Sequence, residues 1–173
     1  MKHRAIVACS LALLMGATQA DAMTIVYNVT LSGTESVPAN ASTATGSATV
    51  TVDDVANTVG VVMSFTGLTG GNASAAHIHC CVATTANGPV VIPFAGFPSA
   101  TSGTYSNLFT GVSAANIAGI EAGLAYINIH NSVFPGGEIR GDILTPVPEP
   151  ETYALMIAGL AAVGAIARRR RSA

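Results

Sequence analysis

Alternation between apolar and polar residues is the strongest structural signal in this sequence. Ala48, Val50 and Val52 alternate with polar residues, and a second run places Val59, Val61, Met63 and Phe65 on one face. Residues 54–57 lie between the two runs and have the polar character of a tight turn. A period of two residues is typical of strands that bury one face, so the pattern predicts a β-hairpin.

Runs with strand character continue over most of the chain. Six further runs with strand character span residues 24–31, 75–81, 89–94, 104–109, 124–130 and 137–143. One short helix is predicted after Ser113, a good N-cap, because Ile117 and Ile120 follow at helical spacing and Gly123 ends the pattern. About eight short strands and one helix predict an all-β fold, a small antiparallel β-sandwich.

The N-terminal residues 1–22 have the features of a signal peptide. Lys2 and Arg4 precede an apolar run over residues 5–17, and Ala20-Asp21-Ala22 supplies the small residues that a signal peptidase requires. We therefore expect export across the inner membrane, with a folded body over residues 23–145.

The C-terminal end consists of segments that differ in composition. Residues 146–152 form a proline-rich linker, and residues 153–167 contain no charged side chain. A helix of fifteen residues covers about 22 Å, against roughly 30 Å for the hydrocarbon core. Arg168, Arg169, Arg170 and Arg171 follow directly. Because arginine clusters stay on the cytoplasmic side, we predict a transmembrane helix over 153–167 and a cytoplasmic end over 168–173.

Together, the linker, the apolar helix and the arginine cluster resemble a PEP-CTERM sorting signal. Its motif is carried by Pro148, Glu149 and Pro150. The resemblance implies a Gram-negative bacterium, transient anchoring in the inner membrane, processing by an exosortase, and a final place at the cell surface or outside the cell. Signal peptidase, exosortase, and exopolysaccharide or other matrix components are the partners that follow from it.

Charge excludes one class of partner. Only 9% of the residues are charged, and six of the seven lysines and arginines lie in the two terminal segments. The body holds six carboxylates against Arg140 alone. A body with this charge has no basic patch for nucleic acid. No catalytic signature such as G-x-S-x-G is present, so we expect a non-catalytic protein without a required cofactor.

Three segments of the body resemble the CHRD (chordin-type) domain. They are Ala76-His77-Ile78-His79 with the following Asn87-Gly88-Pro89, then Gly103-Thr104-Tyr105, and finally Tyr126-Ile127-Asn128-Ile129-His130 with Gly137-Glu138-Ile139-Arg140-Gly141. The family commonly has a glycine shortly after its His-x-His, where this chain has Cys80-Cys81. The resemblance implies an extracellular β-sandwich module for binding or structure, with no agreed enzymatic activity.

His77, His79 and His130 are the histidines of the body, and strand alternation places His77 and His79 on one face. Three imidazoles that converge can hold copper or zinc, and we predict that Glu138 orients His130 as a hydrogen-bond acceptor. The alternative is a structural ladder in which Arg140 ties carboxylates and Asn128 together.

The adjacent cysteines leave four alternatives open. Cys80 and Cys81 form a strained vicinal disulfide, pair between molecules, stay free, or contribute Cys81 as a soft metal ligand. Two functions follow from the sequence as a whole. The first is a non-catalytic surface or matrix protein, and the second is a metal-binding exported protein with redox activity.

Overall fold

The structure is a computed structural model that describes residues 24–145 and 150–171. The predicted signal peptide over 1–22, and Pro148 and Glu149 of the sorting motif, lie outside these ranges.

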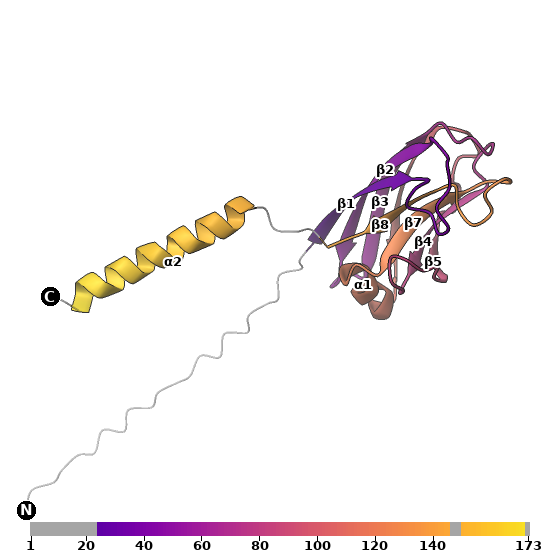
Figure 1. Cartoon of the computed structure of the whole chain (residues 1–173). Helices are drawn as coiled ribbons and strands as arrows, with labels where there is room; N and C mark the ends of the chain where they lie inside the picture. Colours follow the sequence, from indigo (N-terminus) through magenta and orange to yellow (C-terminus); the bar gives the residue numbers. More distant parts are fainter. Residues whose placement is uncertain (1–23, 146–149, 172–173) are drawn as a thin grey trace, which may run out of the picture.

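Residues 24–145 form eight strands and one short helix, α1 (Ala114–Glu121). Figure 1 shows how these elements are arranged. The strands are β1 (Thr24–Ser32), β2 (Thr45–Asp53), β3 (Thr58–Thr66), β4 (Ala75–Cys80), β5 (Val90–Pro93), β6 (Gly103–Thr110), β7 (Ala125–His130) and β8 (Ile139–Ile143). Ser113 caps α1 by accepting a hydrogen bond from the backbone N–H of Asn116. The predicted elements are therefore confirmed, with boundaries that shift by a few residues.

The predicted antiparallel all-β fold is confirmed, and its sandwich-like body is built from one sheet. All strands belong to one antiparallel sheet with the order β5-β4-β7-β8-β1-β2-β3-β6. The sheet folds over between β8 and β1, where the register pairs only Ser32 with Arg140. A side chain on Gly141 would overlap the carbonyl oxygen of Thr30 at this fold and approach Val29 Cγ1 to 2.6 Å. The two strands can approach this closely because Gly141 has no Cβ.

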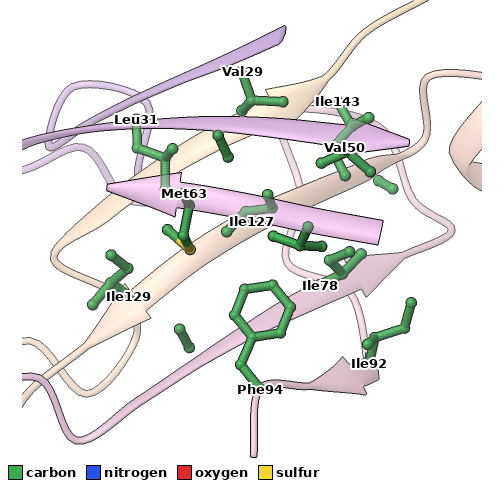
Figure 2. Packing of buried hydrophobic residues seen from close by; sticks show 14 of the residues in the cluster. Val29, Leu31, Val50, Met63, Ile78, Ile92, Phe94, Ile127, Ile129 and Ile143 are labelled. Carbon is green, nitrogen blue, oxygen red and sulfur yellow. The ribbon is translucent and has the colours of Figure 1, made fainter. Parts of the chain in front are cut away.

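The hydrophobic core lies between the two halves of this folded sheet. Figure 2 shows Ile78 and Ile127 from one half facing Val50 and Met63 from the other. At the two outer strands, β5 and β6, aromatic side chains complete the core. Phe94, which follows β5, stacks on Tyr105 of β6 with ring centroids 5.1 Å apart.

Strand direction divides the body into two ends. β1 begins and β8 ends at one end, together with loop 81–89 and α1. Loops 33–44, 67–74 and 131–138 lie at the opposite end, which we call the loop end.

The C-terminal segment forms the helix α2 (Pro150–Arg171). Large apolar side chains along it are exposed, among them Leu155 and Leu160. No helix within residues 24–145 or 150–171 is long and apolar enough to cross a membrane. The predicted transmembrane helix over 153–167 is therefore not supported. Its uncharged stretch accounts for only about 22 Å of helix.

Candidate metal centre

The outer face of β4 and β7 carries the three histidines of the body together with Tyr126 and Asn128. His77 and His79 alternate on β4 with the buried Ile78, and Tyr126, Asn128 and His130 alternate on β7 with core isoleucines. In the register, Ala75 pairs with His130 and His77 with Asn128. His77 and His130 are therefore diagonal neighbours on one face, although 53 residues separate them, and His79 lies two positions along β4 from His77.

Ligand atoms of the three histidines converge. One ring nitrogen from each of His77, His79 and His130 lies within 4.8 Å of the other two. Nδ1 of His77 and Nε2 of His130 are 3.3 Å apart. Two nitrogens that each lie about 2.0–2.1 Å from a tetrahedral ion are roughly 3.3–3.4 Å apart, so this pair already has the spacing of two ligands.

Backbone carbonyls fix the tautomers of two of the rings. Nδ1 of His79 lies 2.8 Å from the carbonyl oxygen of Gly88, and Nδ1 of His130 lies 2.8 Å from that of Pro135. A carbonyl can only accept, so each Nδ1 carries the proton and each Nε2 presents a lone pair. Nε2 of His79 is buried and has no hydrogen-bond partner. A bound cation would satisfy this lone pair.

Burial also favours the neutral, ligating form of the rings. It lowers the pKa of His77 below the ordinary value of 6.5, and the nearby His130 and His79 lower it further. Burial lowers the pKa of His130 as well, and the hydrogen bond to Pro135 offsets only part of this effect. Both rings therefore stay neutral at neutral pH.

Glu138 does not contact His130, which corrects the predicted pairing. Glu138 is fully buried and accepts hydrogen bonds from Ser42, Thr69, Gly70 and Asn131. The carbonyl of Pro135 takes the place that we expected Glu138 to have. Asn131 also accepts from the backbone of Val133 and Phe134, so Glu138 supports the loop that carries Pro135. Its effect on His130 passes through that loop.

His79 is the first of three stacked side chains, which come from β4, β7 and β8. Its ring lies parallel to that of Tyr126 with centroids 4.7 Å apart, and the guanidinium of Arg140 lies 3.5 Å from the centre of the Tyr126 ring. Arg140 also donates to the carbonyls of Thr84 and Ala86 and forms an ion pair with Asp142 at 2.9 Å. The ladder predicted around Arg140 is therefore present, but it extends to loop 81–89 and not to Asn128.

A separate hollow of about 550 Å³ lies on the outer face of β1, β2, β3 and β6. Serine and threonine hydroxyls contribute much of its lining, together with Asn28 and Tyr105. It contains no imidazole, carboxylate or thiol, so the candidate chemistry of the body lies at the histidines and not in this hollow.

Comparison with known families identifies the body. The family model of the CHRD domain matches residues 27–143, from β1 to the end of β8. The chain belongs to the CHRD domain family. The three histidines and Glu138 all lie within the matched part of the CHRD domain. No curated protein and no solved structure matches the chain.

A second family model, that of the PEP-CTERM protein-sorting motif, matches residues 146–171. The match covers Pro148, Glu149 and Pro150 and the arginines from Arg168 to Arg171. It implies processing by an exosortase. This protein therefore combines a CHRD domain with a C-terminal sorting motif.

Cys80 and Cys81 form a vicinal disulfide at the end of β4. This selects one of the four alternatives and removes Cys81 as a thiolate ligand. Cys80 is fully buried and Cys81 is exposed. Both sulfur atoms face α1 at Gly119, where a side chain would overlap them. In this CHRD domain the disulfide and Gly119 therefore form part of the contact between β4 and α1.

Sequence reasoning missed the groups that orient the imidazoles. Gly88 and Pro135 act through backbone carbonyls, which have no side-chain signature. Strand alternation does place Tyr126 on the same face as Asn128 and His130, but it does not show that Tyr126 stacks on the ring of His79.

Proposed function

We propose that this protein is an exported, exosortase-processed surface or matrix protein whose CHRD domain is a non-catalytic binding or structural module. The observation that supports this best is the combination of a CHRD match over residues 27–143 with a sorting motif over 146–171. A body with six carboxylates and a single arginine is suited to solubility outside the cytoplasm.

Removal of the C-terminal segment tests this proposal. In a Gram-negative host with an exosortase, the intact mass of the mature protein should lack the residues that follow the motif. Glu149→Ala should leave these residues in place, because it changes the central residue of the motif. Glu151→Ala, two positions further on, is the matched control and should be processed normally. Removal of the same residues from all three proteins, or from none of them, would contradict the sorting role of the motif.

A second candidate function is the binding of copper or zinc by His77, His79 and His130. It is supported by three imidazole nitrogens within 4.8 Å of one another and by the unpartnered Nε2 of His79. In the metal-free protein, Nδ1 of His77 donates to Nε2 of His130, because Nδ1 of His130 already donates to Pro135. A bound ion would take the place of the proton between His77 Nδ1 and His130 Nε2, and both nitrogens would then bind the ion.

Electrostatics favours a cation at this place. Arg140 is the only lysine or arginine between residues 23 and 145, and Asp142 neutralises it. Imidazole suits copper and zinc, whereas calcium and magnesium require oxygen ligands that the cluster does not offer. Redox activity would require copper, which can change its oxidation state, whereas zinc cannot.

Titration of the metal-free full chain with Zn²⁺ or Cu²⁺ tests the metal function. We expect one ion per chain, and His79→Ala should weaken binding by roughly 100-fold or more. Because the pKa values of His77 and His130 lie below 6.5, protons should compete for these rings only at more acidic pH. Asn28→Ala on the exposed face of β1 is the control and should leave the affinity unchanged. Equal affinity of the wild type and His79→Ala would contradict the assignment.

A further inference from the structure

The outer face of β7 carries a second buried polar group that no described contact satisfies. Asn128 lies between Tyr126 and His130 on β7 and is only 3% exposed. In the register it stands opposite His77 on β4 and Arg140 on β8. Its side chain therefore lies on the same face as the three histidines, next to His77, with Gly136 and Gly137 of the following loop beside it.

The two ends of the Asn128 amide differ in their surroundings. Nδ2 lies 3.5 Å from the carbonyl oxygen of Gly136, while the buried Oδ1 accepts no hydrogen bond. A buried carbonyl without a donor has lost its hydrogen bonds to water without replacing them, which destabilises the fold. Such a cost calls for a donor that would occupy the site when the protein is functional.

His79 Nε2 and Asn128 Oδ1 are the two unpartnered buried side-chain atoms in the described part of the chain, and both belong to this face. They do not hydrogen-bond to each other, since neither atom has a partner. Both can act as acceptors here, because Nδ1 of His79 holds the ring proton. One occupant that combines a cation with a hydrogen-bond donor would satisfy both atoms.

We propose that the metal ion held by His77, His79 and His130 keeps a fourth position for an exchangeable water, and that Asn128 Oδ1 accepts a hydrogen bond from this water. The inference rests on the proposed metal function. Three protein nitrogens leave one tetrahedral position open, which is typical of zinc sites that exchange ligands. An amide oxygen is a hard ligand that suits calcium or magnesium better than copper or zinc, so Asn128 contacts the water and not the ion.

This arrangement makes a prediction about which ligands the centre prefers. Asn128 Oδ1 can only accept, so it stabilises ligands that carry a proton, such as water. Azide binds transition metals but has no proton to donate. Asn128 therefore disfavours azide relative to water, and replacing the amide should change the affinities for metal and for azide in opposite directions.

The experiment uses the full chain loaded with Co²⁺, whose visible absorption responds to changes of ligand. Azide should change the wild-type spectrum with saturation. Asn128→Leu has a similar shape without the acceptor, and it should weaken Co²⁺ binding by about 10-fold and strengthen azide binding by about 5- to 10-fold. Asn128→Asp should instead retain Co²⁺ and weaken azide binding, because the carboxylate holds the water and repels the anion.

A purely structural role for Asn128 would lower both affinities in Asn128→Leu, or change neither, and either result would overturn the inference while the metal centre stands. No effect of azide on the wild-type spectrum would show a closed centre and would also overturn it. If the wild type binds no Co²⁺, Zn²⁺ or Cu²⁺, the proposed metal function fails and the inference fails with it. Asn28→Leu on the exposed face of β1 is the control for the same substitution away from the centre and should alter neither affinity. If Asn128→Leu does not fold, an unchanged azide affinity in Asn128→Asp overturns the inference.

Discussion

Replacing Glu138 by alanine should lower the free energy of unfolding by roughly 3 to 5 kcal/mol. The carboxylate accepts from the hydroxyls of Ser42 and Thr69, at 2.5 and 2.7 Å, and from the backbone N–H of Thr69 at 2.6 Å. Gly70 and Asn131 donate to its other oxygen. Loss of the carboxylate would leave donors from three loops without a partner. Urea denaturation measures the effect, and a loss under 1 kcal/mol would contradict this role.

The same residue predicts how stability depends on pH. Burial alone would raise the pKa of Glu138, but the hydrogen bonds from Ser42, Thr69 and Gly70 outweigh it and lower the pKa below its ordinary value of 4.5. A carboxyl whose pKa is lower in the folded state stabilises the fold above pH 4.5, and this stability is lost as the pH falls through the folded-state pKa. The melting temperature should therefore fall on acidification below pH 4.5, and less steeply in Glu138→Gln. The exposed Glu35→Gln is the control, with a change within about 0.5 kcal/mol at neutral pH.

Gly141→Val should destabilise the body by roughly 3 kcal/mol or more. The new side chain would overlap the backbone of Thr30 where the sheet folds between β8 and β1. A backbone atom cannot turn aside as a flexible side chain can, so the two strands must separate. Their separation would open the core along Ile143 and Val29, both of which are buried.

The midpoint of urea unfolding measures the effect of this variant against a glycine in open space. A Cβ on Gly136, in the loop between β7 and β8, would meet no atom within 4 Å. Gly136→Val should therefore cost far less than Gly141→Val. Comparable losses for the two variants would show that the close contact between β8 and β1 is not required.

The strands could be predicted from the sequence because their burial has a period of two. In β2 and β3 the alternation is nearly complete, and the hairpin around residues 54–57 follows directly. The folding of one sheet into two halves could not be predicted, since it depends on a close approach between β1 and β8 that alternation does not encode. The sequence alone does not show why position 141 is a glycine. The register shows that it lies where β8 closely approaches β1.

The three histidines of the candidate centre could be predicted from the sequence, but the groups that orient their rings could not. His77 and His79 share a face by alternation, and His130 could join them only if β4 and β7 were neighbours, which the structure confirms. The carbonyls that orient the rings belong to loops, whose path depends on tertiary contacts. Glu138 was expected beside His130 on the polar face, but the hydroxyls of Ser42 and Thr69 that hold it come from loops that sequence periodicity does not position.

β1 begins and β8 ends at the same end of the body, and this limits how the body can be oriented when the chain is attached. A chain that is held at its C-terminal motif is attached next to the end where β8 finishes, and the loop end then points away from the attachment. His130 and His77 lie toward that distal end of β7 and β4. The candidate centre would therefore face the surroundings and not the attached surface.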